Sequence, residues 1–235
     1  MKAFQFKVEG NWAHFKKPET NNNPLSHDLI TKTALIGMIG AVLGIERQEM
    51  KTIFPILSDN LLYGVQLLSS VKKVSWGFTS KTAINPSAAG SPKYFEFLKK
   101  PKYKITLALK NNESESLFQR FLNAIKNEEA VYPPVLGWHN CPANLKFVSE
   151  GNVEEFESKT FSTTSFVSAS HKPEVSGEFR VGFDKLPTYQ NDDFWNLPEK
   201  YEQIIYPDFP NEITVSGNCY EYQADNENNQ ELWLM

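Results

Sequence analysis

The sequence predicts an α+β fold, and three observations support this. Of the 235 residues, 40% are hydrophobic and 13% aromatic, which is normal for a chain that buries a sizeable core. Segments in which apolar residues alternate, typical of half-buried strands, occur between segments with helical spacing. The longest apolar run, residues 34–45, spans twelve residues and contains three glycines, so it predicts a buried helix rather than a membrane span.

Strands and helices are expected to follow one another in a regular order in the first 150 residues. In chain order, we expect a strand at 3–8 ending at Gly10, a polar loop at 11–28, a helix from Thr31 or Thr33 to about Leu43 with Gly44 near its end, a short helix at 47–57 broken at Pro55, a strand at 62–74, a strand at 103–109, a helix at 113–126 capped by Asn111 or Asn112, and a strand near 145–148.

This order matches the ferredoxin-like (RRM-like) βαββαβ fold, which many RNA-binding domains share. We therefore expect a ferredoxin-like domain at residues 1–150 with an insertion at about 72–100. Within the insertion, Asn85-Pro86, Ala89-Gly90 and Ser91-Pro92 indicate turns rather than a regular element.

A β-rich acidic extension, residues 151–235, is expected to pack on this domain. Its short strand candidates are residues 161–169, 179–183, 213–215 and 219–222.

Small residues occupy one face of the first predicted helix. Gly37, Gly40, Ala41 and Gly44 follow i, i+3, i+4, i+7 spacing. Each glycine costs helix stability, about 1 kcal/mol relative to alanine, so the pattern indicates a packing requirement. We expect this face to approach a sheet closely.

Charge is segregated along the chain. The net charge is −4, but residues 1–150 carry a balance of +7 and residues 151–235 a balance of −11. Residues 71–104 contain eight lysines and one acid, Glu96. Such a basic stretch can follow a phosphate backbone whatever the whole-chain charge, because salt confines the field to roughly 8–10 Å. The alternative is a solvated lysine-rich loop.

The compartment is expected to be the cytoplasm. Cys141 and Cys219 are the only cysteines, lie far apart and form no disulfide framework, and the N-terminus shows no secretory signal. No membrane association is expected.

Familiar catalytic motifs are missing from the sequence. It contains no GxxxxGK[ST], GxSxG or HExxH pattern, and His139 with Cys141 forms an HxC without a second ligand pair. The four histidines could serve acid–base RNA cleavage, but no pair of them has a spacing that supports it. We expect no catalytic residue, metal or cofactor.

Two segments have the composition of a ligand-binding surface. Residues 10–21 mix aromatic, amide and cationic side chains, the set that stacks on unpaired bases and binds phosphates. Residues 132–142 form a turn with Gly137 at its centre, where a glycine permits close backbone approach. The alternatives are an ordinary loop whose aromatic residues fill the core and a simple tight turn.

Together these segments resemble the Cas-five family of CRISPR-associated proteins, of the RAMP superfamily. The resemblance rests on the first strand with Gly10 and the loop WAHFKKPETN at 12–21, on the helix TALIGMIGAVLG at 33–44, on residues 94–103, and on Leu136-Gly137 followed by Cys141-Pro142. It is strong over residues 3–45, moderate over 90–148 and faint beyond 150. In general character it is nearest to versions from type I-B systems.

The resemblance implies a ferredoxin-like RNA-binding domain with an inserted thumb hairpin, here about residues 72–100. It also implies a subunit that caps the 5′ handle of CRISPR RNA (crRNA) in a Cascade complex, beside a backbone subunit and a large subunit, with target DNA contacted indirectly. One branch of the family cleaves precursor RNA with tyrosine, lysine and histidine. This chain has no Lys-His neighbour after the third strand, because His171-Lys172 lies in the faintly matching tail, so we expect no nuclease activity.

We therefore expect lysines to neutralise phosphates and aromatic side chains to stack on bases. The residues expected to bind RNA are Asn11, Trp12, His14, Phe15, Lys16, Lys17, Thr20, Asn21, Lys32, Lys72, Lys73, Trp76, Lys81, Lys93, Gly137, Trp138, His139 and Asn140. The alternative function is a metal-independent endoribonuclease that uses His14 or His139 as acid or base.

Overall fold

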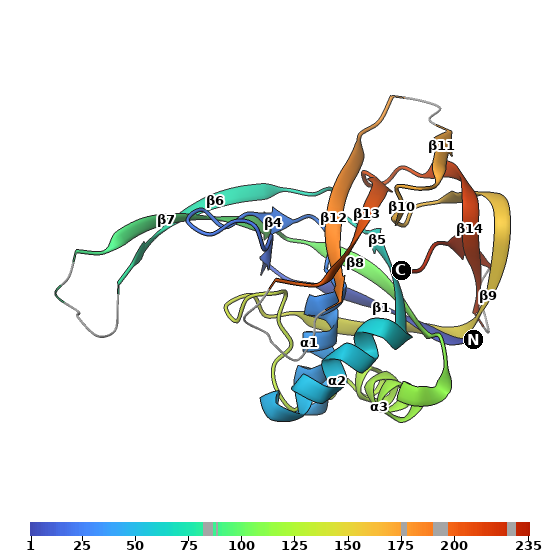
Figure 1. Cartoon of the computed structure of the whole chain (residues 1–235), viewed down its shortest axis with the longest axis horizontal. Coiled ribbons are helices and arrows are strands. Elements are labelled where there is room, and N and C mark those ends of the chain that lie inside the picture. Colours follow the sequence, from blue (N-terminus) through green and yellow to red (C-terminus); the bar gives the residue numbers. More distant parts are fainter. Residues whose placement is uncertain (82–86, 88, 175–177, 190–196, 225–228) are drawn as a thin grey trace.

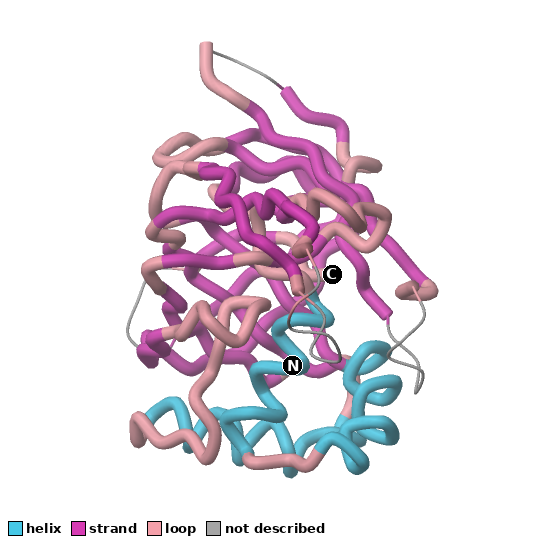
Figure 2. Tube along the Cα trace, turned by 90° about the vertical axis from the view of Figure 1, so that its left-hand side faces the viewer, coloured by secondary structure: helices cyan, strands magenta, loops and turns pink. Residues whose placement is uncertain are grey.

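A long β-hairpin projects from an α+β body in the computed structural model of the chain (Figure 1). The structure describes residues 1–81, 87, 89–174, 178–189, 197–224 and 229–235. Figure 2 shows the helices gathered on one side of the body, with the strands stacked beside them. Among the described residues, none of the helices has the length and apolar character needed to cross a membrane.

The helices are α1 (Lys32–Leu43), α2 (Arg47–Asn60) and α3 (Glu115–Lys126), the last preceded by the 3₁₀ turn η1 (Asn112–Ser114). The strands are β1 (Lys2–Glu9), β2 (Trp12–Ala13), β3 (Phe15–Lys16), β4 (Ser26–His27), β5 (Leu61–Leu67), β6 (Lys73–Ser80), β7 (Ser91–Lys99), β8 (Lys102–Leu109), β9 (Asn144–Thr163), β10 (Val167–Ser168), β11 (Lys172–Glu174), β12 (Val181–Tyr189), β13 (Lys200–Pro207), β14 (Ile213–Ala224) and β15 (Gln230–Leu232).

The main sheet has the strand order β11-β14-β9-β1-β8-β5, with β15 also paired to β14. Every neighbouring pair is antiparallel. Alternation along β1 sends one set of side chains toward the helices, where Phe4 contacts Phe118 and Phe6 contacts Phe121, with ring centroids 5.0 and 5.7 Å apart. The helix-facing side of this sheet is therefore the main core.

The caps of α1 explain its bounds. The hydroxyl of Thr31 accepts a hydrogen bond from the backbone N–H of Ala34 at 3.1 Å, and Gly44 ends the helix with φ of +68°. The expected close approach of its small residues to a sheet is wrong. A Cβ on Gly40 would meet Met50 of α2, and nothing lies within 4 Å of a Cβ on Gly37.

Pro55 does not break α2, which continues to Asn60. The missing N–H removes one helical hydrogen bond. Met50, Phe54 and Leu57 lie in the core on both sides of the proline, and their burial holds the two halves in one helix.

The strand expected at 62–74 is in fact two elements. β5 ends at Leu67, where the alternation stops at two serines, and β6 begins at Lys73. Ser91-Pro92 begins β7 instead of forming a turn. Strand β2 pairs only with the far end of β7, at Leu98 and Lys99, so the β2 side of β7 needs no backbone N–H at Pro92. Asn85-Pro86 lies outside the described residues.

The C-terminal part contains more strand than the sequence predicted. β9 extends for 20 residues instead of four, and the segment expected at 161–169 divides between the end of β9 and β10. β12 begins at Val181 and continues to Tyr189, and it pairs with the unpredicted β13. Leu186 and Ile204 of this pair join the main core beside α1. The expected boundary at residue 150 falls inside β9.

Candidate nucleic-acid interface

The two segments singled out in the sequence lie against each other. The backbone N–H of His14 donates to the carbonyl oxygen of Leu136 at 3.0 Å. Gly137 has φ of +82°, and a Cβ there would collide with the His14 carbonyl. At the other end of the contact, a Cβ on Gly10 would lie 2.7 Å from the Leu136 side chain. Both glycines are needed for this close backbone packing.

The first of these segments also forms an edge strand of the hairpin sheet, whose order is β2-β7-β6. Trp12 lies opposite Lys99 and Ala13 opposite Leu98. The hairpin therefore starts from the same place as the Gly137 turn, and the two expected RNA-binding regions are continuous in space.

One face of the hairpin is covered by aromatic rings. We call the aromatic face the set Trp12, Trp76, Phe78, Phe95, Phe97 and Trp138. Trp12 and Trp76 have ring centroids 4.4 Å apart, and Trp138 from the Gly137 turn stacks on Phe97 at 5.3 Å. Phe78 meets Trp138 edge-on at 5.8 Å. The turn thus rests on the hairpin through ring contacts.

The aromatic face has a buried layer and an exposed layer. Phe97 is buried, whereas Trp76 and Phe78 are 41% and 38% exposed although both lie on a regular strand. Exposed aromatic rings supported by other rings form a rigid platform for stacking. Contiguous exposed apolar surface of this kind typically marks a binding site.

His14 does not lie on this surface. Its ring is buried, with Nδ1 donating to the Glu96 carbonyl oxygen at 2.8 Å, and it packs beside Phe95 and Phe97. Burial lowers the pKa of the imidazole, an effect that outweighs the hydrogen bond to Glu96. The Nε2 atom is buried and has no hydrogen-bond partner among the described residues.

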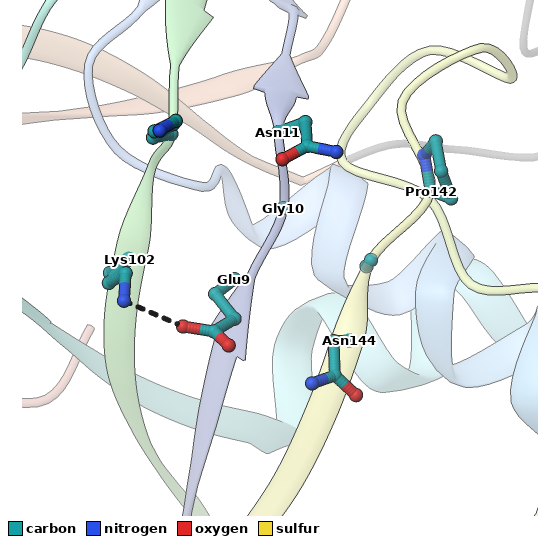
Figure 3. A pocket seen from close by; sticks show the side chains of 8 residues that line it. Glu9, Gly10, Asn11, Lys102, Pro142 and Asn144 are labelled. Atoms are coloured by element: carbon teal, nitrogen blue, oxygen red, sulfur yellow. Dashed lines mark ion pairs between the residues drawn. The ribbon is translucent and has the colours of Figure 1, made fainter.

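A pocket lies where β1, β8 and β9 meet the two segments (Figure 3). Its volume is about 470 Å³, in the range of ligand pockets. Glu9 lies between Lys102 and Asn144, with Asn11 and Pro142 at the far end, and Glu9 and Lys102 form an ion pair at 3.2 Å. Lys100, Gly10 and Ala143 complete the lining. We call this the strand-end pocket.

The backbone at the strand-end pocket is unusual. Lys100 adopts φ of +51°, a conformation that non-glycine residues rarely take, and its N–H donates to the Asn11 carbonyl oxygen at 2.8 Å. The pocket holds carboxylate, ammonium and amide groups together. These can donate to and accept from the edge of a nucleobase.

The expected lysines divide into exposed and internally paired groups. Lys72 and Lys81 are exposed and Lys93 is half-buried on the hairpin. Lys73 instead forms ion pairs with Asp28 and Glu96, at 2.7 and 3.0 Å. Burial alone would lower the pKa of Lys73, but these two carboxylates raise it. Its charge is thus largely used within the protein.

The base of the hairpin contains a second ion pair, whose carboxylate is buried. Lys17 lies 3.0 Å from Asp184 of β12, which also contacts His27 at 3.1 Å. Burial raises the pKa of the Asp184 carboxyl, but the hydrogen bonds and charges of His27 and Lys17 prevail and hold it below its ordinary value. The pair joins the first loop to the C-terminal sheet.

Lys32 and Phe15 are not positioned to contact a ligand. Lys32 is only 3% exposed, with its amine 3.4 Å from the Met235 carbonyl oxygen, and Phe15 is in the core. Burial of a charged group lowers the Lys32 pKa to about 7. The sequence shows Lys32 beside a helix cap but gives no sign that the C-terminal segment covers it.

The remaining expected residues lie at the surface. Lys16, Asn21, His139 and Asn140 are exposed, and Trp138 is half-buried. Thr20 is half-buried, donating to the Lys17 carbonyl and accepting from Leu25, so it shapes the loop. Among the described residues, no group of three His, Cys, Asp or Glu side chains is arranged to hold a metal.

Sequence reasoning missed several residues of this surface. Phe78, Phe95 and Phe97 belong to the aromatic face, and Lys100, Lys102 and Asn144 line the strand-end pocket. The hairpin itself was expected at about residues 72–100, and alternation in 74–78 and 93–97 would have revealed which of its rings share one face. The pocket residues converge only through strand register, which leaves no local signal.

Comparisons with known proteins agree on the class of the chain. The family described as CRISPR-associated protein (Cas_Cas5) matches residues 4–207. No curated protein matches the chain. A crystal structure of a CRISPR protein from Archaeoglobus fulgidus is similar with a TM-score of 0.57 and 17% identity, covering 97% of this chain and 98% of that chain.

Two chains from larger assemblies share the fold. One comes from a CRISPR RNA-guided surveillance complex, with a TM-score of 0.51 and 14% identity over 91% of both chains. The other comes from the Type III-B Cmr-beta complex bound to cognate target RNA and AMPPnP, with a TM-score of 0.50 and 9% identity over 90% of this chain and 86% of that chain. At these identities the likeness concerns the fold alone. Because the family matches most of the sequence, the chain belongs to the Cas-five (Cas5) family of CRISPR-associated proteins.

Proposed function

We propose that this chain is a non-catalytic subunit of a type I CRISPR Cascade complex that binds and caps the 5′ handle of crRNA. Membership of the Cas-five family supports the CRISPR role. The observation that carries RNA binding is the aromatic face, in which Trp76 and Phe78 are exposed on a projecting hairpin and supported by further rings. Single-stranded RNA is recognised largely through such stacking.

The arrangement of the central strands is consistent with a ferredoxin-like domain at residues 1–150. The order β9-β1-β8-β5, with α1 and α2 between β1 and β5 and α3 between β8 and β9, has the connectivity of that fold. The β6–β7 hairpin would be its thumb. The acidic extension, residues 151–235, would face protein partners or solvent.

Within this proposal, the side chains that stack on RNA bases are Trp12, Trp76, Phe78 and Trp138. Lysines near the hairpin would bind phosphates: the exposed Lys16, Lys72 and Lys81 and the half-buried Lys93. Lys32 and Phe15 leave the proposed contact set because they are buried. His14 leaves the stacking set for the same reason and supports the platform from beneath.

The partners in this proposal are the Cascade backbone subunit and the large subunit, with target DNA reached only through the complex. A cytoplasmic location and a type I-B system fit the same reading. RNA-guided recognition of invading DNA would be the role of the whole complex.

The test is binding and cleavage of a labelled CRISPR repeat RNA by the purified chain without metal. We expect a shifted band and no cut product. A scrambled RNA of equal length serves as the control. If the chain binds it as tightly as the repeat RNA, handle recognition is contradicted. Site-specific cutting that is lost in His139→Ala would replace this proposal with the alternative, a metal-independent endoribonuclease that processes precursor crRNA.

A further inference from the structure

Three lysines from three different strands lie side by side on the main sheet. In the pairing register, Lys7 of β1 lies opposite Lys104 of β8 and opposite Lys146 of β9. Directly opposite residues point to the same face of a sheet, with Cβ atoms about 4.5–5.5 Å apart. We call this set the lysine row.

The lysine row lies on the face away from the helices. Phe6 and Val8, the neighbours of Lys7 in β1, are buried in the helix-facing core, so alternation sends Lys7 to the opposite face. Lys7 and Lys146 are exposed, and Lys104 is half-buried with its amine donating to Gln230.

Among the described residues, the C-terminal segment covers the half of this face at the start of β1. At the start of β1, Ala3 packs with Leu232 and Leu234 in a second core, and Gln5 hydrogen-bonds Gln230 at 3.0 Å. Gln230 reaches Lys104 at the border of this cover, whereas Lys7 and Lys146 are exposed beyond it. The open half of the face therefore starts at Lys7.

The open half leads into the strand-end pocket. Two residues beyond Lys7, Glu9 lies opposite Lys102 and Asn144, so the pocket floor is the next row on the same face. Glu9 is the one acid in these two rows, against four lysines. The surface continues from the lysine row, across the pocket, to Asn11.

Like charges directly opposite one another destabilise an antiparallel pair. Lys7 and Lys146, both exposed, have this unfavourable arrangement across the β1–β9 pair. A bound polyanion removes the repulsion by neutralising the amines. The surface is therefore suited to a chain of phosphates rather than to an apolar partner.

We propose that the lysine row and the strand-end pocket form a second contact site for single-stranded RNA. Lys7 and Lys146 would bind consecutive phosphates, and the pocket would hold one unstacked nucleotide beside Asn11. The site would lengthen the contact begun on the aromatic face. This inference rests on the proposed RNA-binding function.

The test is the salt dependence of binding of the labelled repeat RNA by the variant Lys7→Gln/Lys146→Gln. For single strands the slope of log K against log salt is about −0.7 per phosphate contacted, so losing two contacts should reduce its magnitude by about 1.4. The control variant Lys51→Gln/Lys172→Gln makes the same charge change at exposed lysines of α2 and β11. It should leave the slope unchanged.

Each outcome separates the inference from the function on which it rests. If the wild-type chain does not bind the RNA, the proposed function itself fails. If the wild-type chain binds but Lys7→Gln/Lys146→Gln keeps the wild-type slope, the proposed second site is wrong. It is also wrong if the control variant shows an equal reduction of the slope. An unchanged slope together with lost assembly onto the other complex subunits would assign the row to an acidic protein surface and overturn the proposal.

A further variant guards against a folding defect. Lys7→Arg/Lys146→Arg keeps both charges and should retain the wild-type slope, while circular dichroism checks that all variants fold. If the folded arginine variant shows the same reduced salt dependence as the glutamine variant, the lysine charge does not explain the reduction and the proposal is overturned.

Discussion

The indole of Trp138 lies parallel to the ring of Phe95, with centroids 5.2 Å apart and ring planes at 7°. Trp138 belongs to the Gly137 turn and Phe95 to β7, so this stack joins a loop of the body to the projecting hairpin. It positions the aromatic face as well as forming part of it.

Replacing Trp138 with alanine should loosen the hairpin. We expect a loss of about 2 kcal/mol in the free energy of unfolding, because a half-buried ring and its aromatic contacts disappear. Urea denaturation measures the loss, and hydrogen exchange along β7 should show faster local opening. Trp138→Phe keeps a stacking ring and should recover most of the stability. Equal losses in both variants would contradict a role for stacking.

Replacing the exposed rings should weaken RNA binding without unfolding the chain. Trp76→Ala and Phe78→Ala should each lower affinity for repeat RNA by about 1–3 kcal/mol if each stacks on one base. Tyr94→Ala is the matched control, since Tyr94 is 56% exposed on the opposite face of the same hairpin. Fluorescence anisotropy measures affinity. A loss in Tyr94→Ala as large as in Trp76→Ala would exclude a face-specific platform.

Stability should fall in acid because of Asp184, whose side chain is only 5% exposed. Its folded-state pKa is below the ordinary value of 3.8, so the folded chain binds fewer protons than the unfolded chain in that region. The stabilisation is present above about pH 4 and is lost as the pH falls through the folded pKa.

Asp184→Asn should cost about 3 kcal/mol near neutral pH, because it leaves Lys17 and His27 without their carboxylate. It should also flatten the acid dependence below pH 4. Urea denaturation from pH 6 to 3 measures both effects. Asp208→Asn, at a partly exposed site nearby, is the control. An unchanged acid slope in Asp184→Asn would show that other carboxyls dominate.

Stability should rise with pH above neutral because of Lys32. Burial lowers its pKa from 10.5 to about 7 in the folded state. Between these values the unfolded chain binds more protons than the folded chain, so the free energy of unfolding increases with pH. Lys32→Met should remove this increase and stabilise the chain near pH 7 by roughly 1–2 kcal/mol.

The RNA affinity of Lys32→Met should equal that of the wild-type chain, because Lys32 is enclosed. The exposed Lys51→Met serves as the control and should leave the pH dependence in place, since Lys51 is not among the groups that shift the Lys32 pKa. If folded Lys32→Met binds RNA more weakly than the wild-type chain, Lys32 contributes to the RNA contact after all.

Local pattern was sufficient to predict the elements that alternate or carry caps. Strand β1, helix α1 with Thr31 and Gly44, and helix α3 were expected close to where they lie. Pro55 was misjudged because burial on both sides of it outweighs one lost hydrogen bond. Gly40 was misjudged because sequence shows which face is small but not which element packs on it.

The candidate site was predictable only where its residues are close in sequence. The two loops containing Trp12 and Trp138 were found from composition. Their contact, and the aromatic face that it completes, depend on tertiary packing. The lysine row depends on register between strands about 100 and 140 residues apart along the chain, for which one sequence holds no signal.

The continuity of β9 links the two halves of the protein mechanically. Its first part pairs with β1 and its second part with β14, and Gly151 lies opposite both Ala3 and Ala224. Fragments separated at that residue would each carry half of one strand and an unpaired edge, which invites aggregation. The intact chain should therefore unfold in a single cooperative step, and limited proteolysis should find no stable fragment ending near residue 150.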